Sequence, residues 1–225
     1  MMPHAFAQIG LVAAWLGLVG GVAEGLRQTT DVNTEITRKV VHIGAGHVIL
    51  LAWWLQTPTW MGLAASVGFS GVALLSYRYP LLPGINGVGR HSLGTFFYAI
   101  SIGVLTAGFW PIWQPQYAAL GILVMTWGDD LAALVGQNFG RHPYQVLGNK
   151  KSWEGSLTMA GASFLVGTLV LGATLGLSWP VMAIAGVVAA GATLLETLSF
   201  VGIDNLTVPM GSALLAYGLV HLFGL

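Results

Sequence analysis

The sequence predicts an all-α polytopic membrane protein with about seven to eight transmembrane helices. Of its 225 residues, 55% are hydrophobic and only 7% are charged, whereas a soluble globular domain carries about 25% charged residues. Apolar runs of roughly 20 residues, the length that crosses a bilayer, recur along the chain between short breaks. Because these runs and their loops use up the length, we expect one membrane-embedded domain over residues 1–225.

The apolar runs and their breaks locate the spans in order. The breaks contain helix-ending pairs such as Thr57-Pro58 and Trp179-Pro180. The first run follows a segment without basic residues and ends in Glu24-Gly25-Leu26-Arg27, which favours a first span over a cleaved signal peptide. We expect spans near residues 8–26, 40–56, 60–77, 93–111, 117–138, 156–177, 180–200 and 206–224.

The basic residues indicate the orientation of the spans. All eight of them flank or lie in the first, third and fifth loops. The positive-inside rule then places these loops, and the loop with Asp204, on the cytoplasmic side and the N-terminus outside. The basic residues are Arg27, Arg38, Lys39, Arg78, Arg90, Arg141, Lys150 and Lys151. A formal net charge of zero gives no indication of a nucleic-acid partner.

Small residues recur every fourth position in two spans, and such stripes let helix backbones approach closely in lipid. We expect both stripes to serve packing only. They are Gly17, Gly21 and Gly25 in the first span, and Gly128, Ala132, Gly136 and Gly140 in the fifth.

Adjacent carboxylates interrupt the fifth apolar run at Asp129 and Asp130. Each costs about 2.5–3.5 kcal/mol to insert, so residues of this kind are either functional or pair helices. Two like charges so close require a cation or a basic partner. We expect the following loop, with Lys150 and Lys151, to supply the counter-charge.

That loop leads into the sixth span through Asn149-Lys150-Lys151-Ser152-Trp153-Glu154. Free N–H groups at a helix start, next to two lysines, suit a phosphate group. A solvated basic loop would explain the lysines alone, but it leaves Glu154 at the membrane edge without a reason. The segment matches neither a Walker A loop nor the protein-kinase motifs.

Arg38, Lys39 and His42 open the second span, where basic side chains oppose the helix dipole unless an anion is present. An anchor for anionic lipid headgroups is the alternative, and His47 is compatible with a core histidine.

Glu196 and Asp204 approach the same membrane face, although Asp204 also fits a helix N-cap. Carboxylates for Mg²⁺ and cations for phosphate, beside lipid, indicate a nucleotide-dependent reaction on a lipid.

With these residues the sequence resembles the phytol kinase and dolichol kinase family of membrane-embedded, CTP-using prenyl alcohol kinases, and most of all the phytol kinases of cyanobacteria and plastids. The family is distantly related to CDP-diacylglycerol synthases. In this family the residue after the first Asp is usually small, so Asp130 is a departure that leaves its role open. The motifs that carry the resemblance are Arg38-Lys39-Val40-Val41-His42, Gly128 to Gly136 with Phe139-Gly140, Asn149 to Ser156, Glu196, and Asp204 to Pro209.

The resemblance implies transfer of a phosphoryl group from CTP, with UTP as an alternative donor, to a long isoprenoid alcohol such as phytol or geranylgeraniol. It also implies an active site on the cytoplasmic face of a bacterial or cyanobacterial membrane. Asp129, Asp130, Lys150, Lys151 and His42 are then the expected catalytic residues, with Asp130 or His42 accepting the alcohol proton. The expected nucleotide-binding residues are Arg38, Lys39, Asn149, Lys150, Lys151, Ser152 and Asn205. The expected Mg²⁺ ligands are Asp129, Glu154, Glu196 and Asp204.

Other functions stay open at this point. A kinase for dolichol, farnesol or diacylglycerol, or a CDP-lipid-forming cytidylyltransferase, would use the same groups. An ion-coupled transporter also uses intramembrane carboxylates, but carriers more often show internal repeats and charges at mid-membrane. A non-catalytic assembly factor is the third class. Lipid alcohol, nucleotide and membrane lipids are the expected partners, and a homo-oligomer is neither indicated nor excluded.

Overall fold

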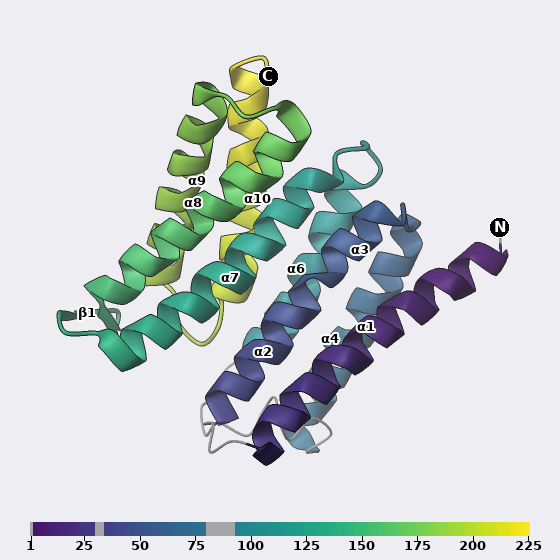
Figure 1. The fold of residues 1–225 in the computed structure, drawn as a ribbon, viewed down its shortest axis with the longest axis horizontal. Helices are drawn as coiled ribbons and strands as arrows, with labels where there is room; N and C mark the ends of the chain where they lie inside the picture. The colour runs from purple at the N-terminus through teal and green to yellow at the C-terminus, as the bar shows by residue number, and fades with distance from the viewer. Residues whose placement is uncertain (1, 30–33, 80–92) are drawn as a thin grey trace.

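The computed structural model describes residues 2–29, 34–79 and 93–225, and most of this part of the chain is helical. In Figure 1, α7 crosses the middle of the molecule, with α8, α9 and α10 on one side and the earlier helices on the other. The elements in chain order are α1 (Met2–Thr29), α2 (Thr34–Gly46), α3 (Val48–Trp54), α4 (Thr59–Arg78), α6 (Gly94–Phe109), α7 (Pro115–Phe139), β1 (Pro143–Val146), β2 (Asn149–Ser152), α8 (Trp153–Leu175), α9 (Trp179–Thr197) and α10 (Asp204–Leu222).

The predicted helical class is confirmed, and helix covers most of each predicted span. The second span is divided at His47, between α2 and α3. Within the described residues, 5 helices are long and apolar enough to cross a membrane. They are Ala5–Thr29, Thr59–Arg78, Pro115–Phe139, Trp153–Leu175 and Trp179–Thr197. The count of seven to eight spans, the orientation and the single domain stay predictions.

Helix α7 forms the core of the bundle because its middle is made of apolar and small residues that other helices cover. Every residue from Tyr117 to Thr126 is buried. A side chain at Gly121 would strike the backbone carbonyl of Pro209 in α10. On the α8 side, a Cβ at Gly128 would lie 2.5 Å from Sδ of Met159. Two close helix contacts therefore hold α7 at fixed depth and rotation.

The two stripes of small residues, in α1 and α7, differ in their contacts with neighbouring elements. In α7, a Cβ at Gly136 would lie 3.1 Å from Oγ of Ser152, which confirms the predicted packing. In α1, a Cβ at Gly17, Gly21 or Gly25 would meet nothing within 4 Å in the described chain. The packing prediction for the first span is therefore wrong within this part of the molecule, because α1 presents its glycines away from α2.

The segment after α7, predicted as a loop, contains a β-hairpin. Strands β1 and β2 pair antiparallel, with Tyr144 opposite Lys151 and Gln145 opposite Lys150. The two turn residues, Leu147 and Gly148, both have positive φ, at 49° and 83°. Two such residues in succession match the twist of a two-residue hairpin. The turn lacks the Asn-Gly or Asp-Gly pair that signals a hairpin in sequence, which is why it escaped prediction.

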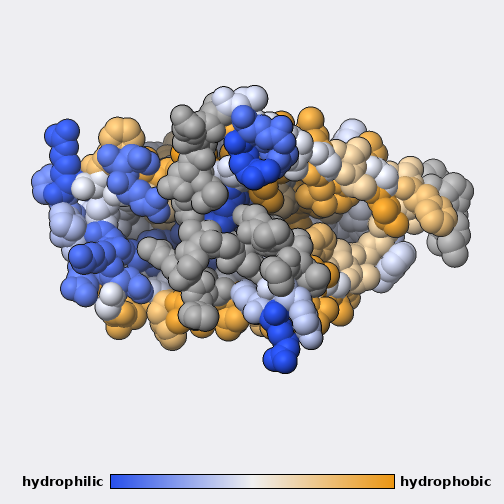
Figure 2. All heavy atoms as spheres, turned by 90° about the horizontal axis from the view of Figure 1, so that it is seen from below, coloured by the Kyte–Doolittle hydropathy of each residue, from blue (hydrophilic) through white to orange (hydrophobic). Residues whose placement is uncertain are grey.

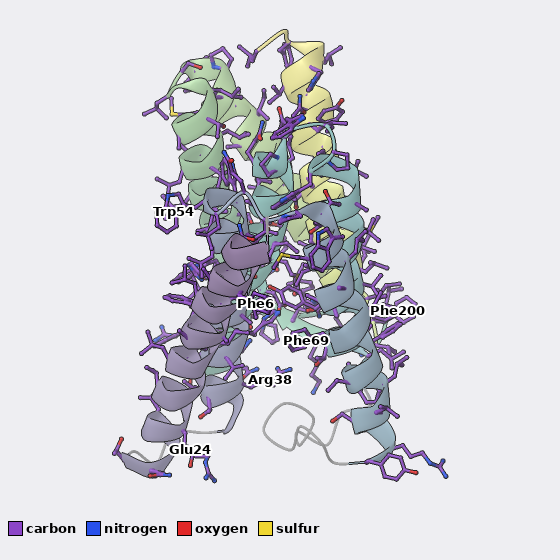
Figure 3. All side chains as sticks on the ribbon, turned by 90° about the vertical axis from the view of Figure 1, so that its right-hand side faces the viewer. Phe6, Glu24, Arg38, Trp54, Phe69 and Phe200 are labelled. Atoms are coloured by element: carbon purple, nitrogen blue, oxygen red, sulfur yellow. The ribbon has the colours of Figure 1, made fainter. Side chains whose placement is uncertain are left out.

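Hydrophilic residues gather at the end of the bundle where α7 leads into the hairpin. Figure 2 views the molecule from this end and shows hydrophilic groups across the face, with hydrophobic groups along the flanks. Figure 3 places Glu24 and Arg38 at the same end. Glu24 and Arg38, which flank the first predicted loop, thus lie at the same end of the bundle as the hairpin.

Candidate active site

A buried ion pair joins α2 to α7. Nζ of Lys39 lies 3.0 Å from Oδ1 of Asp130, and Nδ1 of His42 lies 3.0 Å from Oδ2 of the same carboxylate. Lys39 is 2% and Asp130 is 3% exposed. A carboxylate buried to this extent is retained only when it is paired and hydrogen-bonded. The counter-charge that we expected from the lysine loop comes, for Asp130, from α2.

A layer of polar contacts supports His42 from α6. The Tyr98 ring meets the His42 ring edge-on with centroids 4.5 Å apart. The Thr126 hydroxyl donates to the Ile122 carbonyl at 2.6 Å, and the Tyr98 hydroxyl lies 3.1 Å from Oγ1 of Thr126. Sequence reasoning missed Tyr98 and Thr126. A phenol inside an apolar run was the available signal, because a buried Tyr hydroxyl needs a partner.

Asp129 differs from its neighbour in having no direct partner among the residues that the structure describes. Its half-buried side chain forms no hydrogen bond or ion pair with any residue that the structure describes. It lies close enough to interact electrostatically with Asp204, Glu196 and Lys39. The structure therefore brings Asp129 and Asp204 together, from the middle of the chain and from near its end. This arrangement repels unless a cation is shared between the carboxylates.

The first turn of α10 holds Asp204 in place. Its own N–H donates to Oγ of Ser199 at 3.2 Å, and its Oδ1 accepts the Asn205 N–H at 3.1 Å. The Asn205 side-chain amide lies 3.4 Å from the Gly202 carbonyl and 3.3 Å from Oδ1 of Asp204. Asn205 thus stabilises the loop that positions Asp204. The helix begins at Asp204 with Ile203 as the N-cap, so Asp204 is not the cap itself.

The hairpin is fastened to the end of α9. The Lys151 ammonium donates to the Glu196 backbone carbonyl at 2.7 Å and forms an ion pair with the Glu196 carboxylate. The Asn149 amide donates to the Ser199 carbonyl at 2.9 Å. Lys150, the adjacent residue of β2, is exposed, and its side chain forms no hydrogen bond or ion pair within the described chain. Adjacent strand residues face opposite sides, so the two lysines have different surroundings.

Ser152 and Glu154 complete the helix start after the hairpin. Oγ of Ser152 caps α8 by accepting the Gly155 N–H at 3.1 Å. One Glu154 oxygen lies 2.6 Å from Nδ1 of His142, and the other accepts the His142 N–H at 3.3 Å. Both residues therefore have local partners within the connection between α7 and α8.

A Mg²⁺ site was predicted from four carboxylates. No group of three His, Asp or Glu side chains within the described residues is arranged to hold a metal ion. Glu154 is paired with His142 and Glu196 with Lys151. Asp129 and Asp204 fit a magnesium ion best, because Mg²⁺ is commonly bound by one or two carboxylates together with water and substrate phosphates.

Comparison with known proteins identifies the family. The chain is 56% identical over 209 residues to a phytol kinase from Synechocystis, and the match covers 93% of this chain and 90% of the relative. The chain belongs to the phytol kinase family. More distant phytol kinases match as well: phytol kinase 1 of Arabidopsis thaliana is 26% identical over 92% of this chain and 75% of its own length. A probable phytol kinase of Triticum aestivum is 28% identical over 86% of this chain and 70% of its own length.

No family model and no solved structure matches the chain. Membership in the phytol kinase family confirms the resemblance expected from the motifs, and it confirms that the protein is an enzyme of the kinase class. The apolar helices agree with the expected membrane location. The roles assigned to individual residues, the nucleotide and Mg²⁺ stay predictions.

Proposed function

We propose that this phytol kinase homologue transfers the γ-phosphoryl group of CTP, with Mg²⁺, to a long-chain isoprenoid alcohol, giving the prenyl monophosphate and CDP. Phytol is the preferred candidate and geranylgeraniol the next, since the relatives are named phytol kinases. The choice of CTP rests on the family resemblance. Because the relevant groups gather at the end with the basic loops, we place the active site at the cytoplasmic face.

This proposal rests on the different partners of the two adjacent carboxylates, Asp129 and Asp130. Asp130 forms an ion pair with Lys39 and a hydrogen bond with His42, whereas Asp129 has no hydrogen-bond or ion-pair partner among the described residues and lies near Asp204. A purely structural ion pair explains the carboxylate of Asp130, but it does not explain the carboxylate of Asp129. Asp129 therefore has oxygens available for a bound magnesium nucleotide.

We place the nucleotide phosphates at the end of the bundle that holds the start of α2 and the hairpin. Figure 3 places Arg38 at this end. Lys150 offers its ammonium on the outer face of β2, while Lys151 holds the hairpin to α9. Arg38 and Lys150 neutralise charge on the triphosphate, and phosphoryl transfer depends mainly on such positioning and charge neutralisation. Asp129 and Asp204 would hold the magnesium ion, which would supply charge neutralisation for the triphosphate.

The arrangement of His42 suits proton transfer. With Asp130 ionised, Nδ1–H of His42 donates to the carboxylate, so Nε2 carries the free lone pair. The substrate oxygen bonds to the γ-phosphorus, the bond from that phosphorus to the β–γ bridging oxygen breaks, and CDP leaves. The alcohol proton passes to Nε2 of His42. Asp130 positions the ring and stabilises its charged form.

The test uses purified protein in nanodiscs with Mg²⁺ and γ-labelled CTP, UTP or ATP, offered with phytol, geranylgeraniol, farnesol, dolichol or diacylglycerol. We expect label in phytyl phosphate with CTP, and loss of transfer in Asp129→Asn with the folded protein still extractable. Glu24→Gln is the matched control, because among the described residues Glu24 pairs with its helix neighbours Arg27 and Gln28 alone. Wild-type activity in Asp129→Asn would overturn the residue assignment, and transfer to diacylglycerol alone would overturn the substrate class.

A further inference from the structure

Helix α2 presents different faces to its two neighbours. Lys39, His42 and Gly46 face α7, where a Cβ at Gly46 would lie 2.5 Å from Oγ1 of Thr126. Val40 and Gly44 face α1. These sets are each spaced three or four residues apart, which is the repeat of one helix face. A single helix thus links the polar centre to a second surface.

That second surface is an apolar groove. It has a volume of about 330 Å³ and is lined by Trp15, Leu18 and Val22 of α1, by Val40 and Ile43 of α2, and by His47 between α2 and α3, among others. The helices meet beside Gly44: the Trp15 indole donates to the Gly44 carbonyl at 2.8 Å, and Val19 fills the space beside Gly44. Leu18 is 60% and Val22 49% exposed, so the groove opens toward lipid.

We propose that this groove holds the part of the isoprenoid chain next to the substrate hydroxyl. The inference rests on the proposed function and deepens it. Val40 follows Lys39 directly, so the groove starts at the level of the ion pair. It extends to His47, about 10 Å along the helix axis at a rise of about 1.5 Å per residue. A chain lying here keeps its hydroxyl beside α2 and leaves its distal end in lipid.

A second groove in the described structure is a poorer match. It lies between α6 and α10 and is lined by Phe109, Ile112, Met210 and Tyr217. Phe109 ends α6 and Tyr217 lies in the last third of α10, so this groove lies near the start of α7. Asp129 follows Pro115 by fourteen residues, about 21 Å along α7. The part of this groove nearest the polar centre is Met210, which follows Asp204 by six residues, about 9 Å along α10, whereas Val40 of the α1–α2 groove is adjacent to Lys39.

The inference has a consequence for selectivity. The groove contacts only the isoprene units next to the substrate hydroxyl. Turnover is therefore expected to depend on branching and saturation near the hydroxyl, and only weakly on the total length of the isoprenoid chain. Introducing a large ring at its mouth, Val22→Trp, is expected to raise KM for the prenyl alcohol about tenfold, as for a mismatched apolar pocket. KM for CTP is expected to stay unchanged. Ile9→Trp is the control, because Ile9 is a 51% exposed residue of α1 that does not line the groove.

The direct test is photo-crosslinking of the wild-type protein in nanodiscs with a prenyl alcohol that carries a diazirine near its hydroxyl. Phosphorylation of the probe is measured in the same sample. We expect labelled peptides from residues 15–22 and 40–47, and protection by excess unlabelled phytol. Labelling of the α6–α10 groove by a phosphorylated probe overturns the inference and leaves the proposed function standing. Equal labelling by a diazirine phospholipid, unprotected by phytol, identifies an ordinary lipid contact and overturns it too. Absence of phosphorylation of any prenyl alcohol overturns the proposed function, and the inference with it.

Discussion

Lys39 and Asp130, separated by 91 positions in sequence, lie 3.0 Å apart with almost no exposure. Removing one partner of a buried pair costs about 3–5 kcal/mol, whereas replacing both by apolar residues is often neutral. We therefore expect Lys39→Met to lower the melting temperature in detergent strongly. Lys39→Met combined with Asp130→Leu is expected to recover most of that loss while remaining inactive. A double variant less stable than either single one contradicts the pairing.

Substitution of His42 tests a catalytic role separately from a structural one. We expect His42→Gln to reduce kcat by about 10²–10⁴-fold, the usual contribution of a general base, with KM for CTP nearly unchanged. Tyr98→Phe is the comparison, because it removes a buried hydroxyl that lies 3.1 Å from Oγ1 of Thr126. Steady-state kinetics of both variants check this expectation. Equal losses of kcat in the two would assign His42 a structural role.

The neighbouring lysines of β2 are expected to behave differently. Lys151→Met leaves the Glu196 carboxylate without its cation, and losing a charged hydrogen bond costs about 1.5–3 kcal/mol. It should lower the melting temperature and increase proteolysis of the hairpin. Lys150→Met should keep the melting temperature and raise KM for CTP. Thermal melts and nucleotide titrations distinguish them, and the reverse pattern refutes the assignment.

Gly46 sets the distance between α2 and α7. A Cβ there would lie 2.5 Å from Oγ1 and 2.7 Å from Cγ2 of Thr126. We expect Gly46→Val to push α2 away, to separate Lys39 from Asp130 and to abolish turnover. Gly21→Val places the same side chain where nothing lies within 4 Å, and activity should persist. Inactivity of both variants would show a general intolerance of added volume.

The positions of the helices were predictable because run length and turn residues are local properties. Asp129, Asp130 and His42 were detectable for a similar reason, since charge within an apolar run is costly. The pairing of Lys39 with Asp130 was not predictable, because an apolar helix in lipid carries little information on which neighbour it meets. The different roles of Lys150 and Lys151 were also missed, because the alternation of strand residues applies only once the hairpin of Leu147 and Gly148 is known.

The divided surface of α2 constrains how its length can vary. Inserting one residue in an α-helix rotates everything beyond it by about 100°. Between Lys39 and His47 such an insertion would turn groove residues toward α7 and carry His42 away from Asp130. Changes in chain length compatible with activity are therefore expected in the connections before α2 and after α3. Residues 38–47 form a segment whose register, as much as its composition, is fixed by the neighbours on both sides.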